Sequence, residues 1–308
     1  ELTTAECLGV ADELVGLGCG RVSLIGGEVF MRRDWKEIVL RMTAQGIRVN
    51  VITNGFLFDD RLLSDVRECR VESVAVSLDG PRGVHDRYRQ DGSFDRAVRA
   101  MKALTDSGIP TSVISTLNAE NVAFLDEFYG FLRNYPIFAW QLQACSPMGN
   151  AAKYGVNYAF DQKRVIKFVD ANAKAAPFLL GVADNIGYFT PEEGRIRGNL
   201  SGLAYFKGCS AGICGIGIDS VGNVRGCESM YDEAFVEGNL RRESLRTIWE
   251  DPERFAYNRR FSGKDLTGSC AACEVGEYCG GGCRSYNYFV HRRLFESPCC
   301  ARLKAAGG

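Results

Sequence analysis

The chain has 308 residues, of which 46% are hydrophobic and 24% are charged, and its formal net charge at pH 7 is −1. This length suffices for a hydrophobic core in one large domain or two, and the balanced charge excludes the basic surface of a nucleic-acid-binding or membrane-surface protein. No apolar run has the length of a membrane span, and no signal peptide is visible in these residues. We therefore expect a cytoplasmic protein with no nucleic-acid or membrane partner.

Helical and strand-like patterns alternate through the first 147 residues. A helix is predicted after a cap at Thr3 or Thr4, and further helices follow the apolar spacing of residues 34–46, 59–69, 93–108 (with Ser93 as the cap) and 122–134. Between them lie five short apolar runs, at residues 21–27, 47–55, 71–80, 109–118 and 137–147, which we interpret as strands. Such alternation predicts an α/β fold with a parallel sheet whose ligands bind beyond the carboxyl ends of the strands.

The second part of the chain has a different composition. Helices are predicted over residues 160–175 and 191–205, a hairpin of two short strands over residues 215–227, and one helix over residues 244–260. Nine of the thirteen cysteines crowd the last hundred residues, which places a predicted domain boundary near residue 200. We expect this region to depend on bound metal for its folding.

Four of these cysteines lie within fifteen residues, Ser269 to Cys283, at the spacing C-x2-C-x5-C-x3-C. An odd cysteine total excludes a complete set of disulfides, and C-x2-C spacing in a chain of this size favours metal binding. Two tetrathiolate sites fit the count, and either zinc or iron–sulfur clusters could occupy them. The C-x5-C-x3-C spacing is less usual for zinc and favours iron–sulfur clusters.

The cysteine spacing resembles the SPASM domain of radical S-adenosylmethionine (SAM) enzymes, including the glycine at position 222 between the first cysteines. The resemblance implies two auxiliary [4Fe–4S] clusters. The first would be held by Cys209, Cys214, Cys227 and Cys283, and the second by Cys270, Cys273, Cys279 and either Cys300 or Cys299. The proline before these last two cysteines resembles the usual family ending and favours Cys300.

The first two hundred residues resemble the partial (β/α)6 barrel of the same superfamily. The residues that carry this resemblance, and to which it assigns SAM binding, are Gly26, Gly27 and Glu28 after one strand, Thr53 and Asn54 after the next, and Ser77 and Arg89 after the third. Glu28 would accept the ammonium of SAM and Arg89 would supply the cation for its carboxylate. Glu228, directly after Cys227, corresponds to a proposed catalytic base in sulfatase-maturing relatives. The predicted domains are residues 1–200 (barrel) and 201–308 (SPASM).

The chain departs from the family at one motif. The C-x3-C-x2-C segment of radical SAM enzymes is absent, since Cys7 and Cys19 have another spacing. In the family this segment follows the first strand and precedes the helix that here starts near Thr3, so a third [4Fe–4S] cluster and the first barrel strand are expected upstream of Glu1. A longer protein and a degenerate one both remain open, and retention of Glu28 and Arg89 favours the longer protein.

The resemblance implies a radical SAM oxidoreductase. We expect a peptide maturase that abstracts hydrogen from a ribosomally made precursor peptide through a 5′-deoxyadenosyl radical and installs a crosslink or an oxidation. Its partners would be that peptide and an electron donor such as flavodoxin or ferredoxin. The alternatives are an anaerobic sulfatase maturase that forms formylglycine and, from another class, a non-catalytic iron–sulfur electron carrier or scaffold.

Overall fold

The computed structural model describes residues 1–303 of the chain. It forms two compact units. The first, here called the sheet unit, comprises Thr3–Leu142 and Asn172–Gly181. The second, the cysteine-rich unit, comprises Glu1–Leu2, Gln143–Ala171 and the chain from Val182 onward. The predicted domain boundary near residue 200 stays a prediction.

Six strands form one sheet in the order β1-β2-β3-β4-β5-β6, and the registers of β1 through β4 are parallel. The strands are β1 (Arg21–Leu24), β2 (Arg48–Thr53), β3 (Ser73–Ser77), β4 (Thr111–Leu117), β5 (Ala139–Ala144) and β6 (Leu179–Val182). The five predicted strands and the α/β class are confirmed. Strand β6 was not predicted, because a four-residue apolar run between two helical patterns carries no periodicity of its own.

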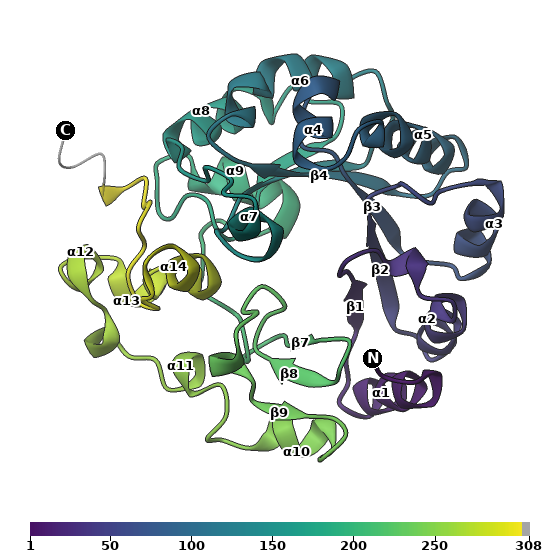
Figure 1. Ribbon diagram of the computed structural model, residues 1–308. Coiled ribbons are helices and arrows are strands. Elements are labelled where there is room, and N and C mark those ends of the chain that lie inside the picture. The colour runs from purple at the N-terminus through teal and green to yellow at the C-terminus, as the bar shows by residue number, and fades with distance from the viewer. Residues whose placement is uncertain (304–308) are drawn as a thin grey trace. The chain divides into compact units, whose positions relative to one another are not determined.

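The helices of the sheet unit alternate with its strands, and Figure 1 shows α2, α3 and α5 along one side of them. They are α1 (Thr4–Gly16), α2 (Trp35–Ala44), α3 (Asp60–Glu68), α4 (Arg82–Tyr88), α5 (Ser93–Asp106) and α6 (Leu125–Leu132), with 3-10 turns η1 (Val29–Met31) and η2 (Asn121–Phe124). Helix α1 starts at the predicted Thr3 cap, which forms a capping box: the Thr3 hydroxyl accepts from the Glu6 N–H, and the Glu6 carboxylate accepts from the Thr3 N–H. The predicted cap of α5 was wrong: Gly92, in a left-handed conformation, precedes the helix, and the Ser93 hydroxyl donates to Asp86.

Trp140 of β5 is the centre of the sheet unit's aromatic core. Its indole is fully buried against Phe128, Tyr129 and Phe178, with ring centroids 5.6–6.5 Å apart. Its Nε1–H donates to the Ser115 hydroxyl of β4 (2.9 Å), which in turn donates to the Leu78 carbonyl just after β3. Because a buried donor or acceptor must be satisfied, this chain of hydrogen bonds fixes three neighbouring strands relative to one another.

The cysteine-rich unit contains short elements. Its helices are α7 (Gly149–Lys153), α8 (Gln162–Asn172), α9 (Glu193–Ser201), α10 (Leu245–Glu250), α11 (Ala256–Arg259), α12 (Gly268–Ala271), α13 (Gly276–Cys279) and α14 (Arg284–His291), with 3-10 turns η3 (Glu233–Phe235) and η4 (Gly263–Asp265). An antiparallel sheet joins β7 (Gly217–Ile218), β8 (Asn223–Arg225) and β9 (Gly238–Asn239), which confirms the predicted hairpin.

The single helix predicted over residues 244–260 was wrong. The structure has two short helices, α10 and α11, separated by Asp251–Phe255. Pro252 lies in this break, and a proline in a helix interior removes one backbone hydrogen bond and clashes with the preceding turn. Among residues 1–303, no helix is both long enough and apolar enough to cross a membrane.

Candidate functional site

The carboxyl ends of β1, β2 and β3 meet at one edge of the parallel sheet. Glu28 follows β1, Thr53 ends β2 and Ser77 ends β3, and the three strands are direct neighbours. The registers pair Leu24 with Val51 and Thr53 with Val76, so the carboxyl ends of these three strands lie side by side. The structure thus brings together at one edge the residues to which the resemblance assigned SAM binding.

Glu28 is held in place by neighbouring donors. The Thr53 hydroxyl donates to Glu28 Oε1 (2.8 Å), and the backbone N–H of Asn54 donates to Oε2 (2.8 Å). The carboxylate also caps η1 by accepting from the Phe30 N–H (3.3 Å). Carboxylate oxygens have about four lone-pair sites, so the fixed Glu28 retains capacity to accept from an ammonium group.

The segment before Glu28 leaves room for a ligand. Gly26 has φ +139°, a conformation that side-chain-bearing residues rarely adopt. A Cβ placed on Gly26 or Gly27 would meet no atom within 4 Å, so open space lies beside this backbone. The Ser77 hydroxyl is half-buried and forms no hydrogen bond within residues 1–303. These groups fit the approach of a polar ligand to the strand ends.

Arg89 is positioned by a buried carboxylate that sequence reasoning missed. Arg89 Nε donates to Asp79 Oδ2 (2.7 Å), and the Asp79 side chain is 6% exposed. Asp79 Oδ1 accepts from the Thr116 N–H (2.9 Å), and its backbone carbonyl accepts from Asn121 Nδ2 (2.9 Å). The signal available in the sequence was the position of Asp79 immediately beyond β3, where a parallel sheet gathers functional groups.

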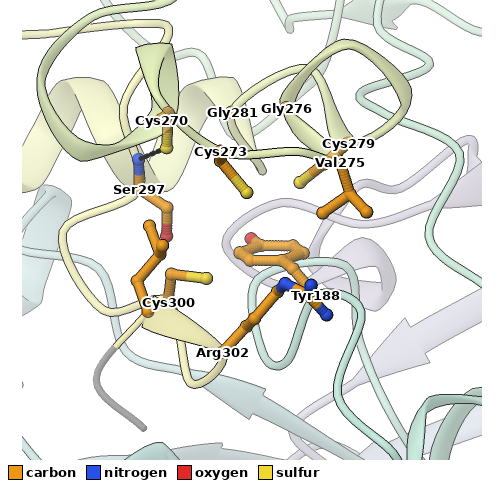
Figure 2. Close-up of a pocket in the computed structure, with 11 residues that line it drawn as sticks. Tyr188, Cys270, Cys273, Val275, Gly276, Cys279, Gly281, Ser297, Cys300 and Arg302 are labelled. Atoms are coloured by element: carbon orange, nitrogen blue, oxygen red, sulfur yellow. Dashed lines mark hydrogen bonds between the residues drawn. The ribbon is translucent and has the colours of Figure 1, made fainter. Parts of the chain in front are cut away.

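Four cysteines of the predicted second set border one cavity, shown in Figure 2. The cavity has an empty volume of about 290 Å³, and its cysteines are Cys270, Cys273, Cys279 and Cys300. In Figure 2 the sulfur atoms of Cys273, Cys279 and Cys300 are directed into the same space. Cys299 does not line the cavity, and its sulfur instead accepts from the Tyr286 hydroxyl at 3.8 Å. The structure therefore places Cys300, and not Cys299, with the other three.

The cysteines of the second set share a cavity and do not converge on a single point. Zinc requires four sulfur atoms about 2.3 Å from one point. Among residues 1–303, no group of three or more Cys, His, Asp or Glu side chains converges in that way. A cavity bordered by four thiols fits the larger iron–sulfur core, and the Ser297 N–H, 3.4 Å from Cys270 Sγ, is a hydrogen-bond donor of the kind that tunes such clusters.

Three cysteines of the predicted first set are brought together. Cys209 and Cys227 pack against the same buried cluster of Ala211, Met230 and Phe235. Burial, with a contribution from the negative charge of Cys209, raises the pKa of Cys283 to about 12. Burial also raises the pKa of Cys227, to which the charges of Glu228 and Cys283 contribute. Cys214 is exposed on the loop that follows Cys209, and this loop is bonded to the segment before Cys227 through the Gly212 N–H and the Gly226 carbonyl (3.2 Å).

Tyr188 touches both sets of cysteines. Its ring lines the cavity of the second set, and its hydroxyl accepts from the backbone N–H of Cys283 (3.0 Å) and donates to the Asp184 carbonyl (2.9 Å). Tyr188 is 2% exposed and has φ +87°, a strained conformation for a residue with a side chain. Such strain persists only where surrounding contacts enforce it and is concentrated at functional sites. The sequence offered no signal for Tyr188.

Glu228 lies beside the first set and is exposed. The Cys227 thiol donates to Glu228 Oε2 (3.3 Å), and the Ser229 hydroxyl is 3.4 Å from Oε1. An accessible carboxylate adjacent to a candidate cluster ligand is able to receive a proton from a bound molecule.

Comparison with known proteins agrees with this arrangement. Residues 1–132 match the family model of the radical SAM superfamily, and residues 209–274 match that of SPASM, an iron–sulfur cluster-binding domain. The mycofactocin maturase MftC of Mycolicibacterium smegmatis is 30% identical over 295 residues, which cover 94% of this chain and 72% of the relative. An AdoMet-dependent heme synthase of Oleidesulfovibrio alaskensis is 26% identical over 317 residues, covering 97% and 79%.

The fold has solved counterparts. The crystal structure of Streptococcus suis SuiB bound to S-adenosylmethionine matches with a TM-score of 0.74 at 16% identity, covering 96% of this chain and 69% of that one. The two family models and the 30% identical relative define the class as an iron–sulfur enzyme that uses SAM. The chain belongs to the radical SAM superfamily and carries a SPASM domain, which confirms the resemblance and the prediction of an enzyme.

A prediction concerns the pH dependence of the segment that holds Arg89. His85 is buried beside this segment, and its Nδ1 accepts from the Asp79 N–H (3.1 Å). Burial lowers the pKa of His85; the charge of Arg89 also lowers it, and those of Asp79 and Asp86 oppose the shift. In the unfolded chain the His85 imidazole is protonated below about pH 6.5, whereas in the folded protein it stays neutral to a lower pH. The contribution of neutral His85 to stability is therefore full above about pH 6.5 and decreases as the pH falls through the folded-state pKa.

We expect hydrogen exchange of residues 79–89 to lose protection between about pH 7.5 and about pH 5.5, after correction for intrinsic rates. The variant His85→Asn, whose side-chain oxygen can replace Nδ1 as acceptor, should show a smaller loss. An equal loss in both proteins would assign the pH dependence to another group.

Proposed function

We propose that this enzyme is a radical SAM peptide maturase that abstracts hydrogen from a ribosomally made precursor peptide and installs a crosslink or an oxidation. The observation that carries this proposal is the 30% identity to a mycofactocin maturase over 94% of the chain. The likeness to SuiB, solved with its precursor peptide SuiA, is one of fold and is consistent with a peptide-sized substrate.

In this proposal the sheet edge binds SAM through opposite charges. Glu28, fixed by Thr53 and Asn54, accepts the ammonium of SAM, and Arg89, fixed by Asp79, supplies the cation for its carboxylate. Gly26 and Gly27 leave the space for the ligand, and the Ser77 hydroxyl supplies a further hydrogen bond. SAM held by these residues would, on receiving one electron, give methionine and the 5′-deoxyadenosyl radical that abstracts hydrogen in this superfamily.

The cysteines divide into two proposed ligand sets. Cys270, Cys273, Cys279 and Cys300 would hold one [4Fe–4S] cluster, as their common cavity supports. Cys209, Cys214, Cys227 and Cys283 would hold another. A third cluster, from residues upstream of Glu1, would be the one that reduces SAM. Glu228 would accept the proton released from the peptide.

The proposed electron donor and cellular location follow from these sites. Reductive cleavage of SAM needs an electron donor, for which flavodoxin or ferredoxin is the proposed partner. None of the thirteen cysteines, all of which lie within residues 1–303, forms a disulfide, which suits a reducing compartment and the proposed cytoplasmic location.

Heme synthesis is a second candidate function. Two relatives named AdoMet-dependent heme synthase, from Oleidesulfovibrio alaskensis and Methanosarcina barkeri, are 26% and 28% identical and each cover 97% of the chain. Both candidates use the same SAM edge, so only the substrate distinguishes them. Sulfatase maturation has support only at the level of fold.

The experiment incubates the full-length protein anaerobically with SAM and dithionite, and adds either short peptides encoded beside its gene or iron coproporphyrin III. We expect a peptide to increase the release of 5′-deoxyadenosine and to lose hydrogen, as measured by mass spectrometry. Conversion of the porphyrin, with every peptide unchanged, would contradict the maturase proposal and support heme synthesis.

A second prediction tests the proposed ligand set at the cavity. Cys300→Ala should lower the iron and acid-labile sulfide content by one cluster, because a tetrathiolate site loses one of its four ligands. The neighbouring Cys299→Ala is the matched control, since Cys299 lies outside the cavity, and it should keep the wild-type content. The ligand set would be wrong if Cys299→Ala lost the cluster and Cys300→Ala kept it.

A further inference from the structure

Arg284, the first residue of α14, is a buried cation beside Cys283. It is 1% exposed, and its guanidinium lies between the rings of Phe261 and Phe295, 5.0 and 4.5 Å from their centroids. Nε donates to Asn258 Oδ1 (2.9 Å), and Nη1 donates to the carbonyls of Gly280, Gly282 and Leu294. All of these partners are neutral.

No carboxylate within residues 1–303 forms an ion pair with Arg284. The other buried arginines differ in this respect. Arg197 pairs with Glu193 (2.9 Å), and Arg225 pairs with Asp219 (2.7 Å). Burying a charge is costly unless an opposite charge compensates it, and a guanidinium does not deprotonate in proteins. The charge of Arg284 therefore requires a compensating group other than Asp or Glu.

Arg284 lies beside cysteines of both proposed ligand sets. Cys283 belongs to the first set, and Cys279 belongs to the second. Arg284 follows Cys283 directly, and its bonds to Gly280 and Gly282 tie it to the glycine segment between Cys279 and Cys283.

We propose that Arg284 is the shared counter-ion of the two auxiliary clusters and raises the reduction potential of both. The inference rests on the ligand sets proposed above. A tetrathiolate-bound [4Fe–4S] cluster carries net negative charge, and one-electron reduction adds another. A fixed positive charge in a water-poor environment stabilises the reduced form more than the oxidised form. Arg284 thereby favours electron transfer from the substrate-derived radical to the clusters.

The test compares the reconstituted wild-type protein with Arg284→Met, Arg284→Gln and Arg284→Lys. Iron and sulfide content is measured first, and midpoint potentials are then obtained from redox titrations followed by electron paramagnetic resonance. At the wild-type midpoint potential, the neutral Met and Gln variants should have a reduced-to-oxidised ratio at least tenfold lower than the wild type. A tenfold change corresponds to a midpoint shift of about 59 mV for a one-electron couple. The Lys variant keeps the charge and should stay near the wild type.

Arg254→Met is the matched control. Arg254 lies in the same unit but has its own carboxylate partners, Glu243 (2.8 Å) and Asp251 (3.1 Å), so its removal should leave both potentials unchanged. Loss of clusters from both neutral variants, with retention in Arg284→Lys, would also support the inference, because charge alone separates them.

Two results would overturn the inference. One is a neutral variant with full iron and sulfide and an unchanged potential. The other is a Lys variant that behaves like the neutral ones, whether by the same shift or by the same loss of clusters, since the shape of the guanidinium would then matter and not its charge. A wild-type protein without iron and sulfide would instead contradict the ligand sets themselves, and the two failures are thereby distinguished.

Discussion

The burial of cysteine sulfur is the constraint on which the cysteine-rich unit depends. Burial raises the pKa of both Cys279 and Cys283 to about 12, so without a metal these thiols stay neutral at physiological pH. At the proposed ligand sets, iron binding would replace their protons and make them thiolates, which would couple cluster assembly to the folding of this unit. The helices and strands after residue 190 are only two to nine residues long. Such short elements provide little periodic apolar surface of their own.

In the sheet unit, protein donors alone hold the negatively charged groups in place. Two carboxylates at its ligand edge are each fixed by donors from neighbouring strands: Glu28 by the end of β2, and Asp79 by β4 and Arg89. The aromatic core around Trp140 fixes the strands that carry Asp79 and its partners. Fixed donors and acceptors lose little entropy on binding a ligand, which would be the advantage of the proposed SAM site at these strand ends.

The sequence was informative where chemistry or periodicity is local. Helix–strand alternation predicted five strands and the α/β class, and cysteine spacing predicted the SPASM domain. Strand β6 was not predicted because its four residues show no periodicity. The helix break at Pro252 was not predicted because the apolar spacing on both sides of it is helical. Asp79, Tyr188 and Arg284 were missed for another reason: their roles come from contacts between residues distant in the chain. An unremarkable arginine after a cysteine becomes informative only when its burial and its neutral partners are known.

Metal and sulfide analysis of the protein, purified and kept under anaerobic conditions, tests the central claim most directly. The account predicts a brown protein with iron and acid-labile sulfide in equal molar amounts, bound through the cysteines of the last hundred residues. A colourless protein that contains zinc and no sulfide would contradict it.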